Sequence, residues 1–149
     1  MKIGECCNRE VVTAEKDMSI AEVARLMQEH HVGDLVVVEN IDGRTRPVGI
    51  VTDRDLVIEV LAQMAPIDAI RVGDVMSYEI TTVNENDELW GTLERMRTLG
   101  VRRMPVVDAT GLLVGIITLD DLVELMAEAM GHIASLIRRE LNTEARRRS

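Results

Sequence analysis

Gly49-Ile50-Val51-Thr52-Asp53-Arg54-Asp55-Leu56-Val57 recurs sixty-six positions later as Gly115-Ile116-Ile117-Thr118-Leu119-Asp120-Asp121-Leu122-Val123. In both copies an apolar run typical of a strand ends at a threonine, and an acidic, apolar stretch typical of a helix follows at once. The chain is therefore predicted to contain an internal duplication, with a strand-to-helix junction in each copy.

The duplication extends upstream of this motif. Four further pairs of similar residues share an offset of sixty-nine: Thr13 with Thr82, Ile20 with Leu89, Met27 with Met96, and Val32 with Val101. Because the offset changes by three between Val38/Val107 and Gly49/Gly115, the first copy carries extra residues in the loop 39–47. Such an insertion is expected in a hairpin turn.

Each junction places a threonine and an aspartate three residues apart at the start of a helix, namely Thr52 with Asp55 and Thr118 with Asp121. Free backbone N–H groups also point outward there, so each pair can face one small polar ligand. In the alternative interpretation the threonine caps the helix and the aspartate is a first-turn carboxylate favoured by the helix dipole. The match between the copies over their whole length favours a shared ligand site.

Hydrophobic periodicity predicts the order β-α-β-β-α in each half. The first half is expected to contain a strand at 10–14, a helix capped by Ser19, a strand at 35–38 buried on both faces, a return strand at 48–52 and a helix at about 53–63. The second is expected to contain a strand at 79–83, a helix from about 87 ended by Gly100, strands at 104–107 and 114–118, and a helix from Leu119 to about Leu141, broken near Gly131 before a frayed tail at 146–148.

The predicted fold class is α/β (α+β): two pseudo-symmetric β-α-β-β-α repeats packed sheet against sheet, with a C-terminal helical extension. The expected divisions are a first repeat at 1–66, a linker at 67–73, a second repeat at 74–130, and a C-terminal helix with a basic tail at 131–149. A cleft between two such halves is the natural place for a ligand.

Composition limits the possible functions. The 149 residues are 46% apolar, contain no phenylalanine, and carry a net charge of −9. Negative charge repels polyanions, and with Trp90 and Tyr78 as the only large aromatics, stacking on nucleic-acid bases is disfavoured. Neither a signal peptide nor a membrane-spanning apolar run is found, so a cytoplasmic protein is expected.

Neither a metal site nor a catalytic site is predicted. Cys6 and Cys7 are adjacent rather than spaced as metal ligands, and His30, His31 and His132 lack the spacing of a helical metal pair. No nucleophile with a nearby base and no Walker-type phosphate loop is present, so the chain is not expected to be an enzyme.

The duplicated motifs give the chain a resemblance to a tandem pair of CBS domains, over roughly residues 1–130. The resemblance rests first on the string G-h-h-T-x-x-D at 49–55 and 115–121, where h is an apolar residue and x is any residue. It rests also on Val101-Arg102-Arg103-Met104-Pro105-Val106-Val107-Asp108 and on its counterpart Val32-Gly33-Asp34-Leu35-Val36-Val37-Val38. It implies a stand-alone module of two CBS domains whose clefts hold adenosine ligands of the AMP, ADP, ATP, NAD or S-adenosylmethionine class.

The resemblance also implies roles for individual residues. Asp55 and Asp121 would accept hydrogen bonds from ribose hydroxyls, and Thr52 and Thr118 would add a hydroxyl contact, which agrees with the strength of charge-assisted hydrogen bonds. Adenine would lie in one slot lined by Thr13, Val32 and Leu35, and in another lined by Thr82, Val101 and Met104.

Phosphate recognition is expected to differ between the halves. Arg102 and Arg103, followed by Pro105, occupy positions where the family often places basic residues, whereas the first half has Gly33 and Asp34 there. Asp34 would repel a phosphate, so the clefts should be unequal unless Arg54 compensates or the arginines reach across the pseudo-axis. In the alternative interpretation Arg102 and Arg103 are solvated residues at the start of a strand.

The expected function is a regulatory, signal-transducing module that binds an adenosine nucleotide and acts on an unidentified protein. The first alternative is a structural dimerisation or docking module with empty clefts, and the second is nucleic-acid or partner binding through the basic tail.

A homodimer is expected because both helices after the T-x-x-D strings have more apolar residues than one face can bury. These residues are Leu56, Val57, Val60, Leu61 and Met64 in one half, and Leu122, Val123, Leu125, Met126 and Met130 in the other. The C-terminal residues Ile133, Leu136, Ile137 and Leu141 are expected to add to the dimer contact.

Overall fold

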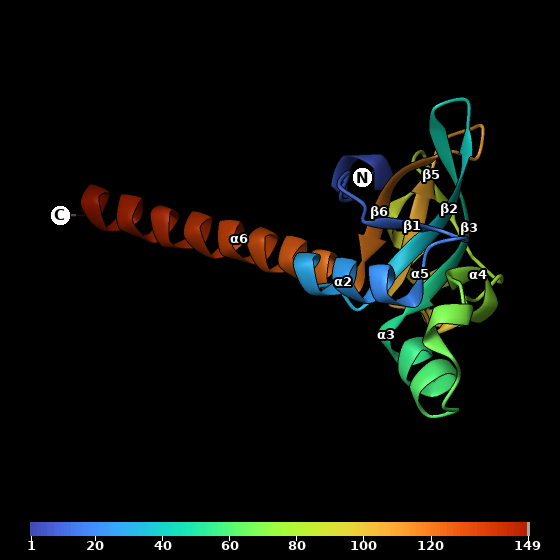
Figure 1. Cartoon of the computed structure of the whole chain (residues 1–149). Helices are drawn as coiled ribbons and strands as arrows, with labels where there is room; N and C mark the ends of the chain where they lie inside the picture. The colour runs from blue at the N-terminus through green and yellow to red at the C-terminus, as the bar shows by residue number, and fades with distance from the viewer. Residues whose placement is uncertain (149) are drawn as a thin grey trace. The chain divides into compact units, whose positions relative to one another are not determined.

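The computed structural model describes residues 1–148, which divide into two compact units. The first unit, Met1–Ile117, holds nearly all of both repeats, and the second begins at Thr118 and contains the C-terminal helix. Figure 1 shows the order of the elements along the chain. The predicted class is confirmed: the fold mixes α and β structure, with two three-stranded sheets and a long C-terminal helix.

The two sheets repeat the same arrangement. In the first repeat β1 (Thr13–Glu15), α2 (Ile20–His30), β2 (Asp34–Ile41), β3 (Arg44–Thr52), α3 (Asp53–Asp55) and η1 (Leu56–Leu61) follow one another. In the second, β4 (Val83–Asn84), α5 (Leu89–Leu99), β5 (Arg103–Val107) and β6 (Leu113–Thr118) precede α6 (Leu119–Arg148). The strand orders are β1-β2-β3 and β4-β5-β6, and in each sheet the first strand runs parallel to the second.

Helix α2 forms where the sequence predicts it. Ser19 Oγ accepts a hydrogen bond from Glu22 N at 3.1 Å, and Glu22 Oε2 accepts one from Ser19 N at 3.2 Å, which together make a capping box. The helix ends at His31, which adopts the left-handed conformation with φ 53°. In α5 that position is taken by Gly100.

Two short helices are exchanged between the repeats: each precedes one repeat in the sequence and packs on the other. Helix α1 (Ile3–Cys6) precedes the first repeat but hydrogen-bonds to the second, through Ile3 N to Asp87 O and Gly4 N to Glu85 O. Helix α4 (Val72–Val75) precedes the second repeat, and its Val72 N and Gly73 N donate to Met18 O and Lys16 O of the first. Ile3 and Val72 are both fully buried, so each repeat is completed by a segment belonging to the other.

Cys6 and Cys7 lie at the end of the exchanged helix α1. At the offset of sixty-nine they correspond to Val75 and Met76, which pack against or within the first repeat's core. Partial burial raises the pKa of both thiols above its ordinary value, which disfavours the reactive thiolate. These thiols are therefore suited to packing rather than to redox chemistry.

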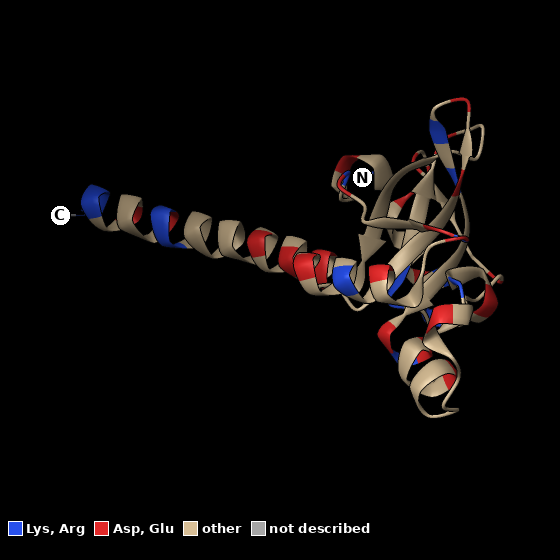
Figure 2. Cartoon of the chain, viewed as in Figure 1, with Lys and Arg blue, Asp and Glu red and all other residues tan. Residues whose placement is uncertain are grey.

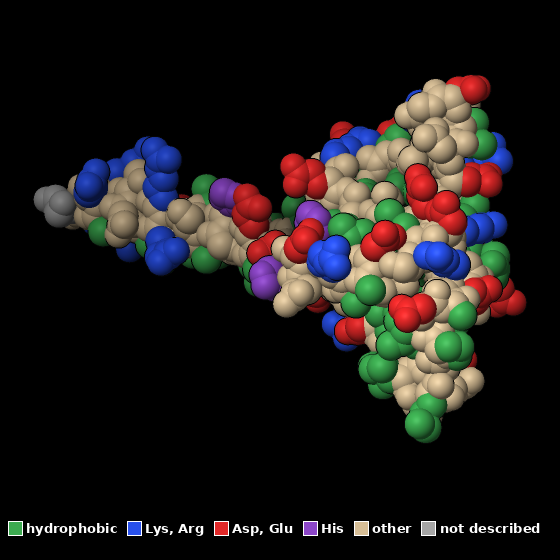
Figure 3. All heavy atoms as spheres, viewed as in Figure 1, with side chains coloured by type: hydrophobic (Ala, Val, Ile, Leu, Met, Phe, Trp, Pro, Cys, Tyr) green, Lys and Arg blue, Asp and Glu red, His purple; other side chains and the backbone are tan. Residues whose placement is uncertain are grey.

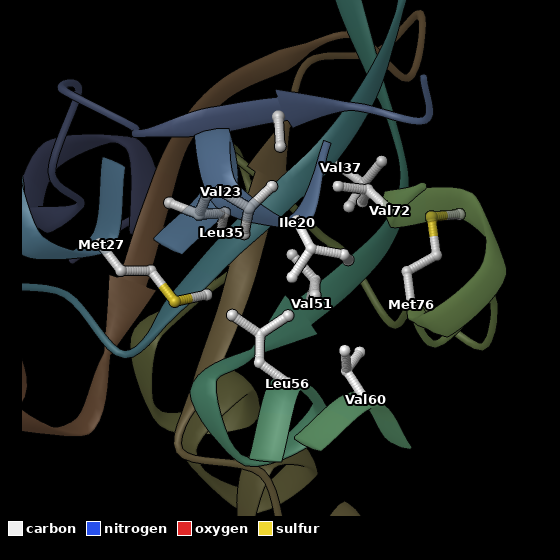
Figure 4. Packing of buried hydrophobic residues seen from close by; sticks show 11 residues of the cluster. Ile20, Val23, Met27, Leu35, Val37, Val51, Leu56, Val60, Val72 and Met76 are labelled. Atoms are coloured by element: carbon white, nitrogen blue, oxygen red, sulfur yellow. The ribbon is translucent and has the colours of Figure 1, made fainter. Parts of the chain in front are cut away.

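Figure 4 shows the core of the first repeat, where Leu35, Val37 and Val51 from the sheet lie among Ile20 and Val23 of α2. Val72 and Met76 reach the same cluster from the exchanged segment. The five residues 34–38 of β2 are all buried, as expected for a strand covered on both faces.

Four local expectations were wrong. The strand expected at 79–83 is reduced to β4 at Val83–Asn84, since residues 79–82 form no strand. Instead of one α-helix over 53–63, the chain forms the short α3 and then the π-helix η1, with a hydrogen bond from Ala62 N to Val57 O at 2.8 Å. This wider turn still buries Leu56 and Val60, four residues apart. Neither the break near Gly131 nor the frayed end at 146–148 is found, because α6 is a continuous helix from Leu119 to Arg148. A single glycine is tolerated in a long helix.

The motif glycines allow the exchanged segments to approach the strands. A Cβ on Gly49 would lie 2.4 Å from Ser77 O, and a Cβ on Gly115 would lie 2.8 Å from Asn8 O. At the same places Ile50 bridges Ser77 and Ile116 bridges Asn8 in antiparallel pairing. The glycine of G-h-h-T-x-x-D is thus required by packing between the repeats.

We predict that Gly49→Ala and Gly115→Ala each destabilise the protein by about 1–3 kcal/mol, because the added methyl group meets backbone that is itself hydrogen-bonded. Gly91→Ala is the matched control: it lies in α5 with open space around its Cβ position, so it should be neutral or stabilising by roughly 0.5–1 kcal/mol. Urea unfolding of the three variants measures the difference. Equal effects at positions 49 and 91 would contradict the packing role.

Candidate functional site

The strand-to-helix junction of the first repeat is held by reciprocal capping. Thr52 Oγ accepts a hydrogen bond from Asp55 N at 3.1 Å, and Asp55 Oδ2 accepts one from Thr52 N at 2.9 Å. The capping interpretation is therefore confirmed for this pair. A carboxylate has two acceptor oxygens, so the cap uses Oδ2 and leaves Oδ1 as an acceptor for a ligand.

The second junction repeats part of this geometry within the C-terminal unit. Thr118 Oγ accepts a hydrogen bond from Asp121 N at 3.1 Å, the same distance as in the first repeat. Both side chains are partly exposed, as are Thr52 and Asp55. The cap of the first repeat holds the Asp55 carboxylate and so pre-organises it for any contact it makes, whereas the bond in the second repeat holds the backbone N–H of Asp121.

In the first repeat the sheet gathers several predicted site residues at one end. Asp34 is the register partner of Thr52, and Leu35 is the partner of Val51. The preceding Gly33 accepts a hydrogen bond through its carbonyl oxygen from Asp53 N at 2.9 Å. The loop before β2 is therefore tied to the first residue of α3.

Asp34 and Arg103 form an ion pair between the two sheets. Arg103 Nε of β5 contacts Asp34 Oδ2 of β2, although these residues occupy equivalent positions, sixty-nine apart, in the two repeats. The Asp34 side chain is only 9% exposed, and that of Arg103 is 36% exposed. Arg103 therefore reaches from the second repeat to the first, where it contacts Asp34; that it serves a phosphate there stays a prediction.

The environment of Asp34 opposes its charge. Burial raises the pKa of Asp34 above its ordinary value, while the charge of Arg103 and its hydrogen bond lower it. The nearby Asp53 carboxylate raises the pKa of Asp34 further. Asp53 was not among the predicted site residues; the signal for it was an acidic residue directly after Thr52, where the second repeat has Leu119.

The remaining candidates are more dispersed. Thr13 is the first residue of β1 and pairs in register with Val36, while Val32 packs against the core cluster. Leu35 and Met104 are fully buried, and Pro105 is buried with them. The carbonyl oxygen of Thr82 accepts a hydrogen bond from Arg95 at 3.2 Å. Val101 and Arg102 lie in the exposed turn before β5, and Arg54 is exposed on α3.

Two surface hollows lie at equivalent places on the first helices of the repeats. The hollow over α2 has a volume of about 350 Å³ and is lined by Met18, Glu22, Arg25, Leu26 and Glu29. The hollow over α5 has a volume of about 490 Å³ and is lined by Thr81, Gly91, Glu94, Arg95, Thr98 and Leu99. None of the predicted site residues lines either hollow, so these hollows are separate from the candidate site.

Two further properties concern residues 1–148 alone. Within this range no group of three histidine, cysteine or acidic side chains is arranged to hold a metal ion. None of the helices described combines the length and the apolar character that crossing a membrane demands.

Comparison with known families explains the duplicated arrangement. The CBS domain profile matches residues 3–62 and again residues 72–128. The chain belongs to the CBS domain family. Both matches include the exchanged lead-in helix of their own repeat, α1 or α4.

Individual relatives agree with this assignment. An uncharacterized protein of Methanopyrus kandleri is 37% identical over 125 residues, which cover 84% of this chain and 62% of that protein. The crystal structure of an uncharacterized conserved protein from Pyrococcus horikoshii has a TM-score of 0.71 at 32% identity, covering 84% of this chain and 91% of the other.

A third relative is the CBS domain pair of protein MJ0100, whose crystal structure contains 5′-methylthioadenosine and S-adenosyl-L-methionine. It has a TM-score of 0.70 at 25% identity and covers 85% of this chain and 99% of that one. A related CBS pair therefore binds adenosine-containing ligands.

We predict that Arg103→Met destabilises the protein by about 1–3 kcal/mol at pH 7, because it leaves a buried carboxylate without its counter-charge. The double variant Asp34→Asn with Arg103→Met is the control, and it should recover much of the loss because no buried charge remains. Denaturant unfolding of the wild type, both single variants and the double variant forms a complete cycle.

The same cycle has a pH signature. A carboxyl group with a raised folded-state pKa binds a proton that the unfolded chain releases, so its contribution to stability falls as pH rises from about 3.9 through the folded value. Without Arg103 the pKa of Asp34 rises further, so the pH range over which this stability is lost extends to higher pH. The deficit of Arg103→Met should therefore shrink on acidification, and a deficit independent of pH would contradict the ion-pair account.

Proposed function

We propose that this CBS pair is a non-catalytic regulatory module that binds an adenosine-containing ligand and transmits its occupancy to a partner protein. The observation that carries the proposal is the capped threonine–aspartate pair at the strand-to-helix junction of both repeats. The ligands bound by the related CBS pair support it. The cytoplasmic location and the signalling role expected from the sequence stay predictions.

Ribose recognition is the role proposed for the two aspartates. The vicinal hydroxyls of a ribose are two donors, and a carboxylate accepts from both with charge-assisted hydrogen bonds. Asp55 Oδ1 is suited to this task because the cap holds the side chain through Oδ2. Thr52 Oγ is already an acceptor from Asp55 N, and its O–H group can donate to the ligand. Asp121 and Thr118 are proposed to do the same in the second repeat.

Adenine is proposed to bind in a slot of each repeat. In the first repeat the base would contact Thr13, Val32 and Leu35, and in the second it would contact Thr82, Val101 and Met104. These side chains are apolar or small, as a flat base requires. Leu35 and Met104 are fully buried, so contact of either side chain with the base requires the residues that cover it to move aside.

The charges around Asp34 suggest which ligand suits the first repeat. Asp34 and Asp53 lie close enough for their carboxylates to interact, and Arg103 is already engaged by Asp34. A phosphate placed there meets repulsion and must compete for Arg103. We therefore propose that the first cleft favours an adenosine ligand without phosphate, or one with a positive group. Phosphate-bearing ligands would use Arg102 and Arg103 in the second cleft, with Arg54 as the only compensating cation proposed for the first.

The structural-dimerisation alternative makes the opposite prediction, namely empty clefts. We predict that at least one of adenosine, 5′-methylthioadenosine, S-adenosylmethionine, AMP, ATP or NAD raises the melting temperature of the protein, since a ligand that binds only the native state stabilises it. If no ligand does so at millimolar concentration, the sensor proposal fails and the empty-cleft alternative stands.

With the best ligand, Asp55→Asn and Asp121→Asn should each weaken binding at their own site by on the order of 10- to 150-fold, which corresponds to loss of one charged hydrogen bond. Asparagine keeps a capping oxygen, so the melting temperature without ligand should change little. The matched control is Asp68→Asn, an exposed carboxylate outside the site. Isothermal calorimetry gives the affinities, and unchanged affinity in both site variants would rule out ribose recognition by these aspartates.

The homodimer also stays a prediction. It is supported by apolar side chains of the first unit that the chain itself leaves in water: Val57 and Leu61 are more than half exposed, and Met64 is 90% exposed. Figure 3 shows hydrophobic side chains gathered over the α3–η1 segment. Binding of nucleic acid by the basic tail has less support, because the chain carries a net charge of −9.

A further inference from the structure

We infer that a phosphate-bearing ligand draws Arg103 away from Asp34 and thereby causes Asp34 to take up a proton, so that ligand binding is linked to pH. This regulation rests on the phosphate contact that is proposed above for Arg103. The proton comes from the solvent and forms an O–H bond on the Asp34 carboxylate, and no other covalent bond changes. A ligand without phosphate, such as adenosine, leaves the ion pair in place and takes up no proton there.

The position of Asp34 makes its charge depend on Arg103. Asp34 begins β2, and its side chain is 9% exposed, so water does little to stabilise the ionised form. Arg103 of β5 supplies the counter-charge through contact of its Nε with Asp34 Oδ2. A buried carboxylate that loses its counter-charge is neutralised by a proton rather than left charged.

A second acidic side chain lies beside Asp34. Helix α3 begins with acidic residues, drawn red in Figure 2, and the first of them, Asp53, raises the pKa of Asp34. Arg54, which follows on α3, is exposed, and so is His31 at the end of α2. The net charge of −9 over the whole chain acts in the same direction as Asp53. Once Arg103 is drawn away, this environment favours the neutral form of Asp34.

The second repeat does not contain the same arrangement. The residue equivalent to Asp34 is Arg103 itself, and the residue equivalent to Asp53 is Leu119. Proton uptake on release of Arg103 is therefore expected at one carboxylate of the pair, and that carboxylate belongs to the first repeat.

Linkage gives the direction of the pH effect. Binding that takes up a proton becomes tighter as pH falls, by up to about tenfold per pH unit. This dependence holds between the pKa of Asp34 paired with Arg103 and its higher pKa without that partner. The paired value already lies above the ordinary one, because burial raises the pKa of Asp34 more than Arg103 lowers it.

The test is calorimetry in buffers of different ionisation enthalpy, which counts the protons that a ligand takes up on binding. The probe is the monomethyl ester of the AMP phosphate, because this group, unlike the phosphate of AMP, does not titrate near neutral pH. At pH values from about 5 to 8 the ester should take up more protons than adenosine, by up to about one per ligand, and should gain affinity relative to adenosine as pH falls.

Three single variants locate the proton. Asp34→Asn should abolish the difference between the ester and adenosine, and thermal unfolding confirms that this variant is folded. Asp53→Asn should keep the difference but move it to lower pH, since a repelling charge is removed. Asp68→Asn, at an exposed position outside the site, is the matched control and should keep the difference unchanged. Titration of the exposed His31 affects both ligands alike and cancels.

Equal proton uptake by the ester and adenosine in the wild type overturns the proposal and leaves the adenosine-binding function standing. An excess that survives in folded Asp34→Asn, or that Asp53→Asn alone removes, also overturns it, because the proton then lies elsewhere. If adenosine and the ester both fail to bind, the proposed function fails and this regulation fails with it.

Discussion

Asp34 places a negative charge where little water reaches it, and Arg103 supplies the counter-charge from the other repeat. A buried ion in a medium of low polarisability is costly unless it is paired and hydrogen-bonded. This requirement connects β2 to β5 at pseudo-equivalent positions. A duplicated fold would be free to use the same residue twice at its axis, but two aspartates or two arginines there would repel each other. The ion pair therefore makes the two repeats chemically different where their sheets are joined.

The repeats also depend on each other for their cores. Val72 and Met76 complete the core of the first repeat, and Ile3, whose backbone N–H donates to Asp87 O of the second repeat, is fully buried. Gly49 and Gly115 allow the backbones of these exchanged segments to approach. Separating the two repeats would therefore expose apolar side chains and leave backbone groups without hydrogen-bond partners.

The sequence predicted features that depend on local pattern. The threonine of G-h-h-T-x-x-D caps a helix in both copies, Ser19 begins α2, and Gly100 ends α5, because caps and periodicity are determined within a few residues. The exchange of α1 and α4 was not predicted, although Ile3-Gly4 and Val72-Gly73 share the offset of sixty-nine and were a usable signal. The pairing of Asp34 with Arg103 was not predicted, since it depends on how two sheets are placed together; the sequence suggested only an arginine that reaches across the pseudo-axis toward a phosphate. The π-helix η1 and the continuity of α6 depend on packing that no local rule specifies.

If Asp34 competes with a ligand phosphate for Arg103, the affinity for AMP relative to adenosine reports that competition directly, since the two ligands differ only in the phosphate. Calorimetry of both ligands on the wild type, Asp34→Asn and Arg103→Met is the measurement. Asp34→Asn should leave adenosine unchanged and tighten AMP by about tenfold, and Arg103→Met should weaken AMP more than adenosine. Equal losses for adenosine and AMP in Arg103→Met, with an unchanged ratio in Asp34→Asn, would contradict the account.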